Sequence, residues 1–342
     1  MPTVIGNKVL TLRDIYAGRA ADGRPDKDIV EMLFEDTSIL DDMVLVEAND
    51  GTTNKTTIRT GISAGTWTAY YEGPQPSKGQ KKQVKDVAGH LESMIEIAKR
   101  LFDDAPDKDA VWQDEITEHG EGMSNDMVDT VFYGNVKSEP RKFNGIVNWY
   151  NTIGTSSHDS KDSAHYVLQG AKASNPSQSM LRSVFLVGWG RKTIHGFYPQ
   201  HHQNVGLTRG TVRTTDASDA NSGIYEVMRQ TLSWDLGLSV KDYRYGGRLA
   251  NLELDYMYTT TGQPDYVELI RRLITRVKNS GMVRQALYME PQVWEAFQTL
   301  FYRKTQGNAV TYGDVLQRQA PTLMGIPVRL PEALETNETL VV

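Results

Sequence analysis

The stretch MVDTVFYGNVKSEPRKFNGIVN, residues 127–148, predicts the end of a long helix followed by a glycine-containing turn. Apolar side chains recur at helical spacing up to and into this stretch and share one predicted face: Trp112, Ile116, Met123, Met127 and Val131. Acidic residues at 107–109 favour a helix N-terminus, and Gly134 with Asn135 favours its end. The sequence therefore predicts a helix over residues 108–133.

Two glycines lie inside this predicted helix, at Gly120 and Gly122. Each costs a helix interior roughly 1 kcal/mol relative to Ala. We therefore expect either a closely packed partner or a bend at these positions.

The residues before the long helix predict a second helix and a hairpin. Between Val84 and Phe102 apolar residues recur every three or four positions, which favours one helical face, and Pro106 ends the segment. Residues 38–82 are rich in Thr and Gly, with a turn signal at 49–51. We expect an extended hairpin with few core residues there, preceded by an N-terminal arm over residues 1–37.

The residues after the quoted stretch mix polar loops, strands and two further helices, which favours an α+β fold. Strands are predicted at 183–189 and 236–254. Pro264 and Pro291 each open a predicted helix. The first of these helices has acidic residues early and basic residues late, an order that suits the helix dipole.

The sequence predicts no catalytic residue, metal site or cofactor. It contains no Cys, which excludes disulfides, thiolate metal sites and cysteine nucleophiles. His195 and the adjacent pair His201-His202, with Asp216 and Asp219 downstream, are the residues that a metal site would use. Adjacent histidines in a polar loop point in opposite directions, so we expect surface histidines instead.

Charge and hydropathy set further limits on the protein. No run of about 18 apolar residues exists, and the first residues lack the blocks of a signal peptide, so we expect no membrane partner. The net charge is −6, but residues 1–135 hold 25 acidic and 14 basic residues against 18 and 23 in the remainder. Opposite charges on the two parts favour attraction between copies.

Residues 127–148 resemble a segment of the major capsid proteins of short-tailed phages, in which a long helix ends in Phe-Tyr-Gly-Asn, followed by Pro, Phe and Gly-Ile/Leu. The resemblance continues through three stretches: IHGFYPQHHQNVGL (194–207), WDLGLSVKDYRYGGRLANLEL (234–254) and LMGIPVRL (323–330). It reaches from about residue 110 to the C-terminus, while the N-terminal third agrees only in layout.

The resemblance implies the Hong Kong 97-like capsid fold, with an N-terminal arm, an extended hairpin called the E-loop, a spine helix in a peripheral domain, and an axial domain. On this chain the parts would be the arm at 1–37, the E-loop at 38–82, the peripheral domain with its spine helix at 83–145, the axial domain at 146–235 and 262–342, and further peripheral-domain strands at 236–261. This last assignment implies a rearranged strand order, because the chain ends at Val342 where the family has more strands.

The resemblance also implies a function without catalysis. The expected role is a major capsid protein that assembles with itself, as hexamers and pentamers, into an icosahedral shell around a double-stranded DNA genome. It would lie in the virion capsid, and in the host cytoplasm during assembly, with scaffolding, portal and decoration proteins as further partners. The alternatives are an encapsulin-like compartment shell and an unrelated metal-dependent hydrolase.

Two groups of residues are candidate contacts. Basic and aromatic residues in or near the predicted hairpin are candidates for contact with a neighbouring subunit: Lys55, Arg59, Trp67, Lys81 and Lys82. Basic residues late in the helix after Pro264 are candidates for contact with the genome or with a subunit: Arg271, Arg272 and Arg276. Any DNA contact is expected to be electrostatic and independent of sequence. Complementarity to the helix dipole is the alternative explanation for the second group.

Overall fold

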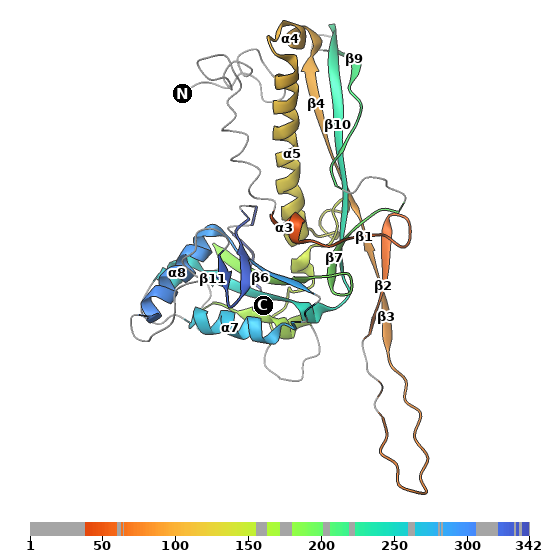
Figure 1. The fold of residues 1–342 in the computed structure, drawn as a ribbon, viewed down its shortest axis with the longest axis vertical. Coiled ribbons are helices and arrows are strands. Elements are labelled where there is room, and N and C mark those ends of the chain that lie inside the picture. The colour runs from red at the N-terminus through yellow and green to blue at the C-terminus, as the bar shows by residue number, and fades with distance from the viewer. Residues whose placement is uncertain are drawn as a thin grey trace.

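A computed structural model of the chain describes residues 38–59, 63, 65–154, 163–171, 180–200, 206–218, 223–258, 264–279, 281, 283–305, 321–331, 333–334 and 337–341. The predicted arm at residues 1–37 lies outside this range. Figure 1 shows an elongated molecule in which a long helix stands beside a strand ribbon at one end. A sheet flanked by helices forms the middle, and a hairpin projects from the other end.

The long helix is α5, Lys108–Tyr133, and it confirms the prediction from the sequence. The side chain of Asp107 caps its first turn by accepting from the backbone N of Ala110 at 3.2 Å. Four of the five residues of the predicted stripe are buried, and Trp112, which is half-buried, donates to Gln230 at 2.9 Å. The helix therefore presents the predicted face to the protein.

The two glycines inside α5 are not crowded by the described residues. A Cβ atom added at Gly120 would first meet Leu207 at 3.8 Å, and one added at Gly122 would meet nothing within 4 Å. The expected close packing partner for Gly122 is therefore absent from the described part of this chain.

The predicted helix over Val84–Phe102 is wrong for most of its length. The segment forms the end of β3 (Lys81–Val87), then β4 (Gly89–Ala98) and only a short helix α4 (Lys99–Asp104). Leu91 and Ile95 are four residues apart, a spacing that fits a helical face and also a strand face. In β4 they face α5 together with Ile97, while Met94 is exposed on the opposite face.

The turn after α5 brings two glycines of the quoted stretch together. The backbone N of Gly145 donates to the carbonyl oxygen of Gly134 at 2.7 Å. A Cβ atom at Gly145 would lie 2.6 Å from the carbonyl oxygen of Phe132, and one at Gly134 would overlap the carbonyl oxygens of Thr130 and Phe143. Only glycine allows this close approach of two backbone segments, and the short helix η2 (Ile146–Asn148) follows.

Twelve of the strands form one sheet, whose main path runs β13-β14-β12-β6-β7-β10-β4. The strands beyond β4 are β5 (Val167–Gln169), β6 (Leu181–Trp189), β7 (Ile194–Tyr198), β8 (Thr208–Arg209), β9 (Arg213–Ser218), β10 (Ile224–Val240), β11 (Gly246–Glu253), β12 (Arg284–Tyr288), β13 (Thr322–Leu323) and β14 (Ile326–Arg329). Short helices η3 (Ser163–Tyr166), η4 (Tyr243–Tyr245) and α6 (Leu254–Tyr258) lie between them.

Strand β10 connects the two ends of this sheet. Its residues 227–236 pair with β4 beside α5, and its residues 237–240 pair with β7. The expected boundary at 235/236 therefore falls inside one continuous strand. Residues 236–261 were also expected to lie with α5, but β11 pairs with β5 and β6 instead, so this assignment is wrong for β11.

The remaining helices pack on the middle of the sheet. Helices α7 (Tyr266–Arg276) and α8 (Pro291–Thr305) match the two helices predicted after Pro264 and Pro291. Their apolar faces, the last turns of α5 and the strands β6, β11 and β12 share one large core. A smaller core lies between the first turns of α5 and the strands β4 and β10.

The projecting hairpin pairs β2 (Thr53–Arg59) with β3, in register from Thr53 opposite Val87 to Arg59 opposite Lys81. The predicted hairpin over residues 38–82 is therefore shifted along the chain. Its first residues form a helix, α3 (Ser38–Asp42), whose Ile39 is fully buried in the large core. Strand β1 (Leu45–Glu47) then pairs with β7.

Candidate assembly interface

The loop that ends the projecting hairpin carries three exposed aromatic side chains. Trp67, Tyr70 and Tyr71 have 99%, 104% and 106% of their reference surface exposed. The backbone N of Glu72 donates to the carbonyl oxygen of Ala69 at 3.1 Å, which closes a turn around the two tyrosines. These four residues, Trp67, Tyr70, Tyr71 and Glu72, are called the hairpin tip below. Aromatic side chains of this size are normally covered, so the tip has the composition of an interface.

The two strands of the hairpin place like charges opposite each other. Lys55 lies across from Lys85, and Arg59 lies across from Lys81. Directly opposed like charges destabilise a strand pair. Lys55 is balanced by Asp50, whose carboxylate is 2.8 Å from Nζ, and this contact is the main cause that lowers the pKa of Asp50. The hairpin therefore presents a basic surface that suits an acidic neighbour.

The structure brings the predicted hairpin residues onto one projecting element. Lys81 and Lys82 are exposed on β3, and Trp67 lies in the loop. Arg59 ends β2, and its side chain lies outside the described part. Lys55 is tied to the turn at the base of the hairpin, so its ammonium group is already paired.

The base of the hairpin rests on a buried polar cluster that the sequence analysis missed. Asn54 and Thr56 of β2 and Asp86 of β3 are buried, Asn54 beside His195 of β7 and the other two beside Ser239 of β10. The hydroxyl of Ser239 donates to Asp86 at 2.8 Å and lies 3.4 Å from the hydroxyl of Thr56. The signal in the sequence is the alternation of Asn54 and Thr56, which puts polar side chains where a docked strand normally has apolar ones.

Two members of this region have strongly displaced pKa values. Burial raises the pKa of Asp86 to about 6, and its hydrogen bond from Ser239 offsets only part of that effect. Burial lowers the pKa of His195 to about 4, and the charges of Lys241 and Arg191 act in the same direction. The Nε2 atom of His195 lies 3.5 Å from the Asn54 amide nitrogen.

The metal interpretation of the histidines finds no support in the described residues. His195 is fully buried, so the expectation of a surface histidine is wrong at this position. His201, His202 and Asp219 lie outside the described residues, and Asp216 is exposed on β9. Within the described ranges, no group of three or more His, Asp or Glu side chains has the geometry to hold a metal ion.

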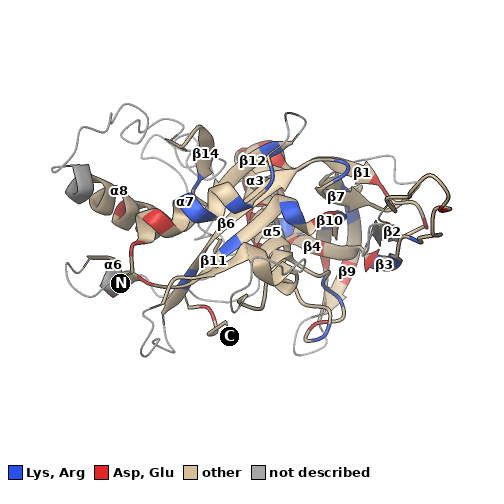
Figure 2. Cartoon of the chain, turned by 90° about the horizontal axis from the view of Figure 1, so that it is seen from below, with Lys and Arg blue, Asp and Glu red and all other residues tan. Residues whose placement is uncertain are grey.

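The predicted basic residues of α7 have different surroundings. Arg271 makes two contacts of 2.7 Å with the carboxylate of Glu268, one turn earlier, and Arg276 donates to the carbonyl oxygen of His165 at 2.9 Å. Arg272 is exposed and has no ion-pair partner in the part of the chain that the structure describes. Figure 2 shows Lys and Arg on α7 in a view where acidic and basic residues are interspersed. Of these three arginines, Arg272 is the one whose guanidinium has no hydrogen-bond or ion-pair partner among the described residues.

The described helices include none that is both long enough and apolar enough to cross a membrane.

Comparisons with known proteins agree with this architecture. Residues 20–342 match the family described as Major capsid protein GP7. The structure is similar to that of bacteriophage Epsilon15, with a TM-score of 0.75, 24% sequence identity, and coverage of 100% of this chain and 99% of that one. No curated protein matches the sequence.

Two further structures are similar at a lower level. The capsid protein of bacteriophage JBD30 has a TM-score of 0.49 and 10% identity, covering 78% of this chain and 83% of that one. The SrpI encapsulin of Synechococcus elongatus has a TM-score of 0.40 and 10% identity, covering 72% and 96%. The similarity to the Epsilon15 structure, at a TM-score of 0.75, confirms the Hong Kong 97-like fold predicted from the sequence. Because the family match spans almost the whole sequence, the chain belongs to the major capsid protein GP7 family and is a subunit of an icosahedral bacteriophage shell.

Proposed function

We propose that this capsid protein assembles as hexamers and pentamers around double-stranded DNA, and that the hairpin β2–β3 reaches onto a neighbouring subunit. The observation that carries the proposal is the exposure of Trp67, Tyr70 and Tyr71 on an element that projects from the rest of the chain (Figure 1). Exposed aromatic surface of this kind gains stability only when another surface covers it.

The energetics of the hairpin favour this role. Ordering a loop residue costs about 1–2 kcal/mol of conformational entropy, which burial must offset. The loop between Arg59 and Lys81 has almost no buried side chain among its described residues. A neighbouring subunit is a source of the missing contacts, and assembly then orders the loop.

Membership of the capsid protein family supports the remaining parts of the proposal. The protein acts without catalysis, in the virion capsid and, before that, in the cytoplasm of the host. Scaffolding, portal and decoration proteins are the further partners, and residues 1–37 serve as the N-terminal arm. Packaged DNA is held without sequence preference, because a shell has to cover any part of a genome.

Shortening the hairpin tests the proposal. Replacement of residues 61–79 by Asn-Gly keeps β2 and β3 joined by a two-residue turn in their present register while removing the tip. We expect a folded chain, by circular dichroism, that forms no closed shells in negative-stain microscopy. A matched variant with Ser at positions 67, 70 and 71 keeps the loop length and is expected to assemble poorly. Closed shells from both variants would refute the role of the hairpin.

The nature of the contents needs a separate measurement. Particles isolated from infected cells and treated with nuclease are expected to retain protected double-stranded DNA. Particles that hold protein cargo and no DNA would favour the encapsulin-like alternative.

A further inference from the structure

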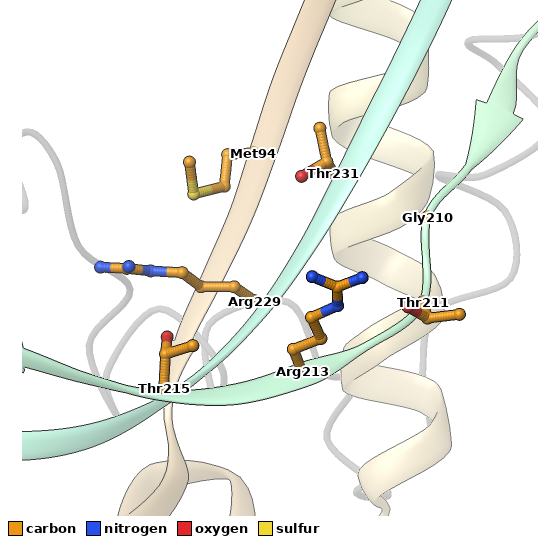
Figure 3. A pocket seen from close by; sticks show the side chains of 7 residues that line it. All are labelled: Met94, Gly210, Thr211, Arg213, Thr215, Arg229 and Thr231. Atoms are coloured by element: carbon orange, nitrogen blue, oxygen red, sulfur yellow. The ribbon is translucent and has the colours of Figure 1, made fainter.

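Two long elements span both the ribbon, which is formed by β4, β9 and β10, and the middle of the sheet. Strand β10 leaves the ribbon between Leu236, which pairs with β4, and Gly237, which pairs with β7. Helix α5 packs on β4 and β10 with its first turns and enters the large core with its last. The other face of the ribbon is open, and a hollow of about 340 Å³ lies there, with α5 behind the strands (Figure 3). The angle between the ribbon and the sheet therefore depends on how the two ends of α5 are held.

The first half of α5 is fixed to the ribbon by polar side chains. The indole nitrogen of Trp112 donates to the side chain of Gln230 on β10 at 2.9 Å. Nδ1 of His119 lies 2.6 Å from the hydroxyl oxygen of Ser93 on β4. Hydrogen bonds are directional, so these two contacts set both the rotation and the height of the helix on the ribbon. Helix and ribbon therefore form one unit.

The last turns of α5 meet the sheet mainly through apolar side chains. Met127, Val128, Val131 and Phe132 lie in the large core. Apolar burial is non-directional, so by itself it holds the helix against the sheet without fixing its angle. Tyr133, the last residue of α5, adds a directional contact, because its hydroxyl donates to Oε1 of Glu338 at 2.7 Å. This hydrogen bond ties the end of the helix to the C-terminal segment.

The C-terminal segment, residues 337–341, is itself fixed to the sheet on both sides of Glu338. The backbone N of Glu338 donates to the carbonyl oxygen of Leu181 on β6 at 2.8 Å, and Oε2 accepts from Arg248 on β11 at 2.6 Å. Further along, the side-chain amide of Asn251 exchanges two hydrogen bonds, of 2.7 and 2.9 Å, with the backbone of Val341. The segment is therefore anchored to β6 and β11 and presents its remaining carboxylate oxygen to α5.

We propose that Glu338 is a positioning residue for assembly, which holds Tyr133 and thereby fixes the angle between the ribbon and the sheet. The ribbon and the projecting hairpin lie at opposite ends of the molecule (Figure 1), so a change in this angle moves one end relative to the other. The rotation between neighbouring copies decides which closed assembly forms. The C-terminal segment thus sets the curvature of the shell. The inference rests on the proposed assembly function and adds the contact that controls its geometry.

Removal of one hydroxyl group tests the proposal with little disturbance of the core. Tyr133→Phe keeps the ring, whose centroid lies 6.1 Å from that of Phe185, and loses only the hydrogen bond to Glu338. The matched control is Tyr150→Phe, which loses a hydroxyl that donates to the carbonyl oxygen of Tyr243 at 2.7 Å within the sheet part of the molecule. Both variants are expected to fold and to show similar, small shifts in thermal unfolding.

Spin labels on the unassembled chain measure the angle directly. The chain contains no Cys of its own, so Gln113→Cys in the first half of α5 and Arg272→Cys on α7 place two labels at exposed positions. We expect one narrow distribution of distances between the labels in the otherwise unaltered chain and in the Tyr150→Phe background. The Tyr133→Phe background is expected to give a distribution about twice as broad, because the chain then samples more than one angle. Equal widths in all three would overturn the proposal.

Shell diameters in negative-stain microscopy test the consequence for assembly. Tyr133→Phe without labels is expected to form shells of mixed diameter together with open, irregular ones. Tyr150→Phe is expected to form shells of the same single diameter as the unaltered chain. Shells of one diameter from Tyr133→Phe, or equally mixed shells from both variants, would overturn the inference. Failure of the unaltered chain to form shells would instead refute the proposed function.

Discussion

Arg248 donates from Nη2 to Oε2 of Glu338 at 2.6 Å, and the two side chains are only 2% and 4% exposed. The hydroxyl of Tyr133, the last residue of α5, donates to the other oxygen of Glu338 at 2.7 Å. Ser183 of β6 also donates to Glu338, and Arg248 donates to the carbonyl oxygen of Tyr150 at 3.1 Å. One buried ion pair thus joins the long helix, two strands and the C-terminal segment.

Removal of Glu338 is expected to destabilise the subunit strongly. Glu338→Ala leaves the guanidinium of Arg248 buried without its carboxylate, and loss of one partner of such a pair costs about 3–5 kcal/mol. Thermal unfolding of the unassembled chain measures the effect. The control is Glu268→Ala, which breaks a solvent-exposed pair with Arg271 and is expected to change the unfolding temperature far less, because water screens the attraction between exposed charges. Equal effects of the two variants would contradict the assignment.

The glycines of the long helix and its turn are expected to respond to Ala in opposite directions. Gly145→Ala pushes a methyl group against the Phe132 carbonyl and is expected to destabilise the chain by about 1–3 kcal/mol. Gly122→Ala adds a methyl group to open space in an exposed helix interior and is expected to stabilise it by about 0.5–1 kcal/mol. Chemical denaturation of the unassembled chain measures both. A stable Gly145→Ala chain would contradict the described turn.

The long helix was predictable because its signals agree with one another. Its apolar stripe, its Asp107 cap and its Gly134 end all indicate the same element, and the structure has it at the same residues. The prediction of a helix was wrong for the residues of β4 because the four-residue spacing of Leu91 and Ile95 fits both a helical face and a strand face. Pairing with residues 227–236 of β10 decided in favour of a strand, and that partner lies too far along the chain for a local pattern to reveal it.

The candidate interface was predictable only as a list of residue types. The sequence indicated that Lys55 and Arg276 were free to contact a partner. In the structure, Lys55 pairs with Asp50, and Arg276 donates to the carbonyl oxygen of His165. Partners that are distant in sequence decide whether a charge is free. Likewise, the hollow that Met94, Arg213 and Arg229 line is formed by three strands, β4, β9 and β10, and the segment before β9. No local sequence motif predicts such a hollow.

The polar cluster under the hairpin is expected to produce two opposing effects of pH. The pKa of Asp86 is about 6 in the folded chain against an ordinary 3.8, so the folded state holds the proton more tightly and stability falls as pH rises from about 4 to 6. The pKa of His195 is about 4 against an ordinary 6.5, so the unfolded state holds that proton more tightly and stability rises over almost the same window. The two effects nearly cancel in the unaltered chain.

Single substitutions separate the two contributions. Asp86→Asn removes the contribution that falls as pH rises and leaves that of His195. The free energy of unfolding of this variant is therefore expected to increase between pH 4 and 6.5, by up to about 3 kcal/mol. His195→Asn removes the contribution that rises with pH and leaves that of Asp86. The free energy of unfolding of this second variant is therefore expected to decrease over the same pH range. Denaturant midpoints of the unassembled chain at a series of pH values measure both slopes. Parallel profiles for the two variants would show that the groups do not titrate as described.

The exposed cation of α7 provides the last test, which concerns the genome. Because Arg271 is paired with Glu268, whereas Arg272 has no ion-pair partner in the described part of the chain, Arg272→Glu is expected to weaken DNA retention more than Arg271→Glu does. Empty shells of both variants are expected to assemble normally, since neither side chain supports the core. Retention is measured as protected DNA per particle at increasing salt, where each lost phosphate contact lowers the salt dependence.

Loss of assembly in the absence of DNA would assign Arg272 to a subunit contact, in which the basic part of one chain meets the acidic part of another. Unchanged assembly and unchanged retention would remove α7 from both roles and leave complementarity to the helix dipole as the reason for its charge order.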